Sequence, residues 1–120
     1  MRILKSALSV LLIIAGLSQV PLVYAGNDLS LVIADHLEQA LIYEEKATEQ
    51  DRLIADQVQK MTDYRATHST DEKIHPTGRI EAMEEHCKAV IKSAEKLKSE
   101  FRRFADWHRQ QADELRKKSN

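Results

Sequence analysis

The chain has little of what most small folds depend on. Its 120 residues include a single cysteine, Cys87, so no disulfide can form within the chain. Three glycines, two prolines and a 5% aromatic content leave few of the residues that favour turns and strands. Charged residues make up 31% of the sequence, and Ala, Glu, Lys, Leu and Arg are abundant, as is typical of long helices. The sequence therefore predicts an all-α fold.

The chain also lacks the motifs that common enzymes use. It contains no glycine-rich phosphate loop, no Glu-x-x-His pair of the di-iron type and no Cys-x-x-Cys-His haem attachment sequence. His86 and Cys87 are adjacent, so on a helix their side chains point about 100° apart rather than at each other. We therefore predict no catalytic residues, no bound cofactor and no enzymatic activity.

The first residues form a separate segment. A positively charged start precedes an apolar stretch, and Val23 and Ala25 stand at the two positions that signal peptidase reads. We predict a secretory signal peptide over residues 1–25 and a mature domain over residues 26–120, located in the periplasm. The alternative is an uncleaved anchor, but the apolar core is shorter than the about 20 residues that a spanning helix needs. We expect no stable membrane insertion after cleavage.

The mature part contains an internal repeat with an offset of 50 residues. The segments that start at His36 and His86 share several residues at equivalent positions. A duplicated helix with a short link can bury its apolar face by folding back on itself. We therefore predict an antiparallel two-helix hairpin of the coiled-coil type. Equivalent pairs include Arg52 and Arg102, Ala55 and Ala105, and Asp63 and Asp113.

Local signals set the bounds of the predicted elements. The first predicted helix covers about 28–66, with Asn27 or Asp28 as its N-cap. A loop over about 67–76 follows, because it contains the turn formers Ser69, Thr70 and Asp71 and ends at Pro76. The second predicted helix covers about 77–118, with Thr77 as its N-cap. Both helices show apolar positions spaced by seven. The first contact line is Ile33, Ala40, Ala47, Ile54 and Met61. The second is Ile80, Cys87, Ala94, Phe101, His108 and Leu115, alternating with Met83, Val90, Leu97, Phe104 and Gln111.

The two predicted helices differ in net charge. Residues 26–76 contain five Lys or Arg against eleven Asp or Glu, a net charge of 5 − 11 = −6, and residues 77–120 contain eleven against eight, a net charge of 11 − 8 = +3. The opposite signs favour pairing, although each exposed ion pair contributes little in water. Acidic residues interrupt the cations of the second helix, so we predict no nucleic-acid surface.

Histidines in the predicted contact lines are candidate metal ligands. In the predicted hairpin, facing residue numbers sum to about 144, so His36 should face His108 and Val58 should face His86. Imidazole is a common ligand of Cu, Zn and Ni ions. One hypothesis is therefore a transition-metal site at His36 and His108, with His86 and Cys87 as further candidates. The alternative is that His36 and His108 are contact residues held by hydrogen bonds.

Sulfur-containing residues form a second group near the predicted loop. Met61, Met83 and Cys87 lie close to His86 in the expected hairpin, and soft sulfur ligands suit Cu(I). Methionine at helical spacing is more often core filler, and a lone buried cysteine behaves as a small apolar residue. Both interpretations remain open at this point.

The first helix has a second apolar stripe. Leu31, Ile42, Leu53 and Tyr64 recur every eleven residues, which aligns them on a straight helix, roughly opposite the contact line. The back of the second helix is polar. We predict that two copies associate through this stripe into a four-helix homodimer, and that the protein has a non-enzymatic binding or structural role. The alternative is that these are scattered exposed apolar residues, which are normal on protein surfaces.

The repeated histidine segments resemble a known group of proteins. Over residues 36–64 and 86–115 the chain is similar to small exported two-helix proteins of Gram-negative bacteria, in which a histidine stands where this chain has Val58. The resemblance implies a helical hairpin and export, and it implies no activity.

Overall fold

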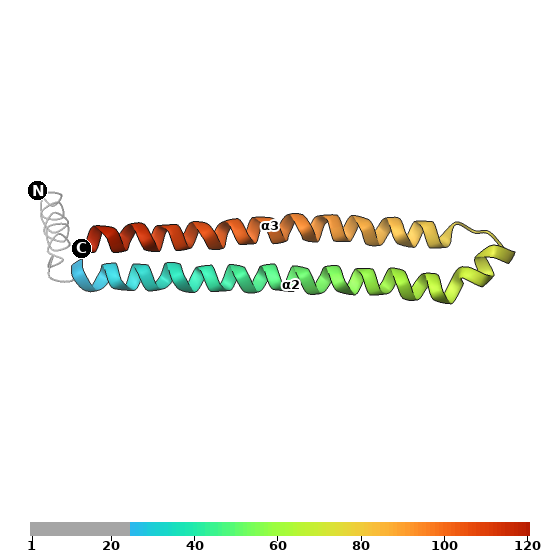
Figure 1. The fold of residues 1–120 in the computed structure, drawn as a ribbon, viewed down its shortest axis with the longest axis horizontal. Helices are drawn as coiled ribbons and strands as arrows, with labels where there is room; N and C mark the ends of the chain where they lie inside the picture. Colours follow the sequence, from blue (N-terminus) through green and yellow to red (C-terminus); the bar gives the residue numbers. More distant parts are fainter. Residues whose placement is uncertain (1–24) are drawn as a thin grey trace, which may run out of the picture.

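Two long antiparallel helices form the whole of the described structure. The computed structural model describes residues 25–120, with α2 at Ala25–Ile74 and α3 at Arg79–Ser119. The helices lie side by side along most of their length, with the end of α3 beside the start of α2 (Figure 1). The described residues include no strand. The predicted all-α hairpin is therefore confirmed, whereas the predicted signal peptide lies outside the described residues except for its last residue, at which α2 begins.

The connection between the helices is shorter than predicted. The predicted loop over residues 67–76 is wrong, because α2 continues to Ile74 and its last turns bend toward the start of α3 (Figure 1). The His75 amide still donates to the Asp71 carbonyl at 2.7 Å, and the Thr67 hydroxyl donates to the Asp63 carbonyl at 2.9 Å. Hydroxyl groups that bond back along their own helix do not terminate it. The polar residues that predicted a turn are thus accommodated as helix.

Glu72 ties this short connection together. Its carboxylate accepts hydrogen bonds from the Thr77 amide at 2.7 Å, from the Thr77 hydroxyl at 2.8 Å and from the Gly78 amide. Burial acts to raise the pKa of Glu72, but these hydrogen bonds outweigh it and hold the pKa below its usual range. Gly78 is the N-cap of α3 with a φ of 73°, in the left-handed region that favours glycine. The predicted cap at Thr77 is therefore wrong by one residue, because Thr77 bonds to Glu72 instead.

Small side chains make the line of contact between the helices. The buried apolar residues are almost all alanine, and Cys87 is the largest side chain that is fully buried. Small residues let helix backbones approach closely, while larger side chains are displaced to the flanks. The buried apolar positions are Ala40, Ala47, Cys87, Ala94, Ala105 and Ala112.

One of the two contact lines predicted for α3 is right, and the other is shifted by one residue in the structure. The line spaced by seven that contains Cys87, Ala94 and His108 faces α2, as predicted. The alternating line runs through Lys98, Ala105 and Ala112 instead of the larger residues one position earlier. Alanines in α2 set a close spacing that alanines in α3 match. As a result, Leu97 and Phe104 remain 47% and 49% exposed.

Neither α2 nor α3 combines the length and apolar character required to cross a membrane.

Candidate functional site: a histidine pair and an apolar face

The predicted facing histidines do meet. The Nδ1 atoms of His36 on α2 and His108 on α3 lie 3.0 Å apart, although 72 residues separate them in the chain. At this distance one ring donates its N–H to the lone pair of the other, so the two rings share one hydrogen. Burial, and in addition the charge of His36 when it is protonated, lowers the pKa of His108. The uncharged form of His108 is therefore favoured.

Aromatic rings enclose the histidine pair. The Tyr43 ring stacks on His108 with ring centres 5.6 Å apart, and the Trp107 ring meets His36 and His108 edge-on at 5.8 Å and 4.9 Å. Tyr43 also stacks on Phe104 at 5.2 Å. With Phe101, whose ring lies 6.1 Å from Tyr43, this cluster holds both phenylalanines and the only tryptophan of the chain. The rings fix the orientation of the imidazoles and exclude water from part of their surface.

Inter-helix ion pairs follow one flank of the contact line. Asp51 of α2 accepts a hydrogen bond from Lys98 at 2.7 Å and pairs with Arg102 at 3.6 Å. The Lys98 hydrogen bond lowers the pKa of Asp51. Glu44, seven residues before Asp51, pairs with Arg109, and its hydrogen bond raises the pKa of that guanidinium. Glu44 is thus engaged by arginine beside the histidine pair.

The other two predicted ligands are not brought to this site. Cys87 is buried 21 residues before His108, which places it about 30 Å away along the helix. His86 is exposed, and so is Val58, so the predicted facing of these two residues is wrong. Nowhere in residues 25–120 do three or more His, Cys, Asp or Glu side chains gather closely enough to hold a metal ion. The candidate metal site therefore consists of two imidazoles.

A difference of one residue explains this error. The sequence repeat has an offset of 50, which makes His86 equivalent to His36. The contact lines repeat with an offset of 51, since the buried or half-buried positions that begin at His36 in α2 correspond to those that begin at Cys87 in α3. One residue on a helix is a rotation of about 100°. Matching side chains in the two copies therefore do not occupy matching positions around the contact line.

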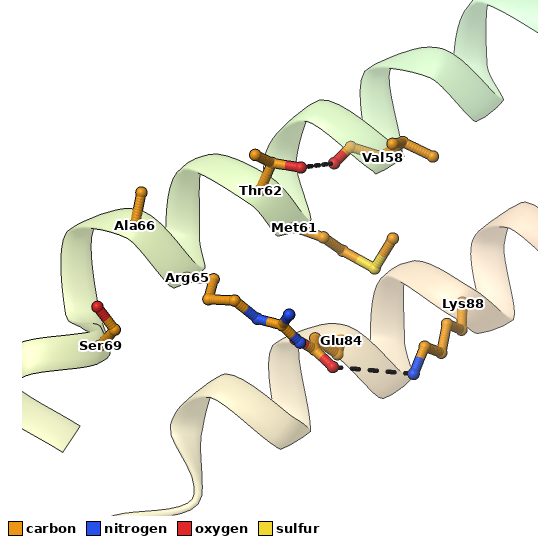
Figure 2. Close-up of a pocket in the computed structure, with 8 residues that line it drawn as sticks. All are labelled: Val58, Met61, Thr62, Arg65, Ala66, Ser69, Glu84 and Lys88. Atoms are coloured by element: carbon orange, nitrogen blue, oxygen red, sulfur yellow. Dashed lines mark hydrogen bonds and ion pairs between the residues drawn. The ribbon is translucent and has the colours of Figure 1, made fainter. Parts of the chain in front are cut away.

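A groove of about 570 Å³ lies near the loop end, between the two helices. In Figure 2, Met61 extends from α2 toward α3, and Glu84 on α3 lies between Arg65 and Lys88. Glu84 pairs with Arg65 across the groove and with Lys88 at 3.8 Å. Met61 and Met83 are half-buried and Cys87 is fully buried, as expected for core filler. The groove is lined by two cations, Arg65 and Lys88, and one carboxylate, Glu84, which already pairs with both, so no charged group in it is left to distinguish a ligand.

The opposite flank of the contact line is apolar. We call this surface the apolar face; it consists of Ile42 and Leu53 on α2 and of Val90, Leu97, Phe104 and Trp107 on α3. Leu53 lines a shallow groove of about 350 Å³ together with Val90 and Leu97. Val90, Leu97 and Phe104 recur every seven residues, so they follow one edge of α3. Leu53, Phe104 and Trp107 are 37%, 49% and 50% exposed.

The ion pairs occupy the other side of the hairpin. Arg102 and Arg109 are spaced by seven on the edge of α3 that faces Glu44 and Asp51, and in a coiled coil the two flanking edges of each helix lie on opposite sides of the contact line. We call this surface the charged face. The cross-helix ion pairs therefore lie on one side of the contact line, and Leu53, Val90 and Leu97 lie on the other.

The predicted interface stripe is present only in part. Leu31, Ile42 and Leu53 are exposed, whereas Tyr64 is half-buried and its ring lies 4.3 Å from that of His68 on the same helix. The prediction that placed Leu97 and Phe104 in the contact line is wrong, because both are exposed. A spacing of seven is expected for residues in a contact line and also for residues along its edge, so the pattern does not distinguish the two. Trp107 offered no periodic signal of its own.

Comparison with known protein families, with curated proteins and with solved structures finds no match for this chain.

Proposed function

We propose that this protein is a non-enzymatic, exported helical module that acts by binding through its apolar face. The supporting observation is that small side chains, mainly alanines, are buried between the helices. The much larger Leu97, Phe104 and Trp107 stay about half-exposed. Full burial of such a side chain contributes roughly 1.5–3 kcal/mol relative to full exposure. Several of them on one face favour association, whereas single exposed leucines would not.

Two matched substitutions test the binding role. Leu97 lies on the apolar face, and Val58, seven residues after Asp51, lies on the charged face. Both are 47% exposed, so replacing either with Glu makes a similar change on opposite sides of the hairpin. We expect the unmodified protein and Val58→Glu to migrate in a cell extract with a mass above that of one hairpin, measured by size-exclusion chromatography under native conditions. Leu97→Glu should migrate as a single hairpin. Equal migration of the two variants would contradict a role for the apolar face.

Export is the second part of the proposal. The signal-like residues 1–25 support it, and cleavage after Ala25 would leave nearly all of α2 in the mature protein. We expect the periplasmic fraction to contain a form that begins at Gly26, identified by intact-mass measurement. A protein of full length retained in the cytoplasmic fraction would contradict export.

Transition-metal binding at the histidine pair is a second candidate function. The 3.0 Å separation of the His36 and His108 Nδ1 atoms favours it, because two imidazole nitrogens bound to one tetrahedral zinc ion at 2.0–2.1 Å are separated by about 3.3 Å. An ion could replace the shared hydrogen with a small movement of either ring. Water, or carboxylates of another molecule, would have to complete the coordination.

Thermal unfolding with added metal separates ligation from hydrogen bonding. If the pair binds metal, Zn(II), Cu(II) or Ni(II) should raise the Tm by mass action, since the unfolded chain has no preformed site. His108→Gln should abolish the increase. His75→Gln, in the exposed connection between the helices, should leave it intact. A Tm that does not respond to the three metals would show that the histidines only hold the helices together.

A further inference from the structure

We infer that the occupant of the apolar face is a second copy of this chain, packed so that α2 of each copy lies against α3 of the other. The inference rests on the proposed binding role of this face and specifies the partner and its orientation. The partners would form an antiparallel four-helix assembly with a two-fold axis along the length of the hairpins. Both loops would then lie at the same end.

The size of the face fits a stable dimer. At 1.5 Å per residue, a helix of the length of α3 is about 60 Å long, and two helices at the usual spacing of 8–10 Å give a face about 20 Å wide. Such a face presents about 1,200 Å², which exceeds the roughly 800 Å² that each partner contributes to a standard interface. The apolar residues occupy the middle of this length, from Val90 to Trp107 on α3, which is about 26 Å at 1.5 Å per residue, and polar residues flank them.

The charges on the two helices select the orientation. The part of the chain that contains α2 has a net charge of 5 − 11 = −6, and the part that contains α3 has 11 − 8 = +3. Placing α2 against α3 of the other copy brings opposite signs together at both edges of the interface, whereas α2 against α2 would bring two acidic helices together. The exposed cation Arg103 of α3 would then lie at the level of the acidic residues Glu45 and Glu49 of the other α2.

The same orientation fixes which apolar residues meet. Rotation about a two-fold axis along the hairpin does not move any residue along that axis. Residues of α2 and α3 that lie at the same position along the axis within one copy are therefore also at the same position across the two copies. Leu53 and Leu97 line the same groove and therefore share a level. Leu97 should consequently pack against the partner's Leu53, and Phe104 should lie near the partner's Lys46.

Sedimentation equilibrium of the purified protein tests the identity of the partner. We expect the unmodified protein and Val58→Glu to sediment as dimers at micromolar concentrations. Leu97→Glu should sediment as a monomer with unchanged helicity by circular dichroism, with a dissociation constant raised on the order of 100-fold or more because the two-fold axis places the change in the interface twice. A monomeric unmodified protein would overturn this inference. The proposed function would still stand if Leu97→Glu alone lost the larger mass in cell extracts.

Disulfide cross-linking tests the orientation. A Leu53→Cys variant mixed with a Leu97→Cys variant should form a mixed disulfide-linked dimer on oxidation, since the buried Cys87 is protected from reaction. Single variants incubated alone should cross-link much less. Preferential cross-linking of Leu53→Cys to itself would place α2 against α2 and overturn the orientation proposed here.

Discussion

His108 illustrates how one half-buried side chain links the fold to pH. Its pKa is lower in the folded protein than the usual 6.5, through burial and the neighbouring His36. The unfolded chain therefore binds a proton more readily near that pH, so the contribution of His108 to stability is complete above pH 6.5 and is lost as the pH falls through its folded pKa.

We expect the free energy of unfolding, measured by urea denaturation, to decrease as the pH falls below about 6.5, well above the range in which carboxylates titrate. His108→Gln should flatten this part of the profile. His75→Gln, which changes an exposed histidine, should leave the slope unchanged. A profile that is flat from pH 7.5 to pH 5 in the unmodified protein would contradict the assignment.

Cys87 was predicted to lie in the contact line, and its burial is confirmed, with no exposed surface. A thiol enclosed between two helices reacts only when they separate. We expect labelling by a thiol reagent to be slow in the native protein and complete within the dead time in strong denaturant, followed by absorbance. Rapid labelling under native conditions would show that the helices separate easily at this level.

At the scale of the helices, the spacing of apolar residues predicted the hairpin but not the rotation of α3. Heptad positions can be read from a sequence, but two lines spaced by seven are available in α3. One contains Leu97 and the other, one residue later, contains Ala105. The line with alanine faces α2 because the helices pack closely. The facing of His36 and His108 could be predicted because the predicted contact lines and the observed ones both contain these residues. The loop could not, since Glu72 bonds to residues beyond the helix end and this contact has no local sequence signal.

The alanines of the contact line should resist enlargement. Ala47 is buried between the helices, whereas Ala55 is exposed on the same helix, and alanine and leucine have similar helix propensities. We expect Ala47→Leu to reduce the free energy of unfolding by about 1–3 kcal/mol, because the helices must move apart. Ala55→Leu should change it by no more than about 0.5 kcal/mol. Urea denaturation followed by circular dichroism measures both, and equal effects would contradict close packing at Ala47.

At the scale of the whole molecule, the two faces have different uses. The ion pairs of the charged face are exposed and contribute little stability in water, but they oppose association through that side because a partner would have to desolvate them. The apolar face has charged groups too, but they are not paired across the helices. Lys46 lies over the Tyr43 and Phe101 rings at 5.4 Å and 5.8 Å, and Glu100 pairs with Arg103 on the same helix beside Phe104 and Trp107. One-sided association limits growth to a closed pair of hairpins rather than an open stack.

A closed pair should be visible in the concentration dependence of stability. If folding and association are coupled, the Tm of the unmodified protein should rise with protein concentration. Val58→Glu should show the same dependence, and Leu97→Glu should lose it. Calorimetry at several concentrations gives the measurement, and a Tm independent of concentration in all three proteins would indicate a hairpin that is stable alone.

The sequence separation of the contacts also sets an order of folding. Arg65 and Glu84 pair across only 19 residues next to the short connection, whereas His36 and His108 pair across 72. Loop closure becomes less favourable as the enclosed segment lengthens, so the hairpin should close from the connection toward the termini, with each pair shortening the loop that the next must close. The histidine pair would then form late and open early, and backbone amides around it should exchange hydrogen faster than those around Cys87.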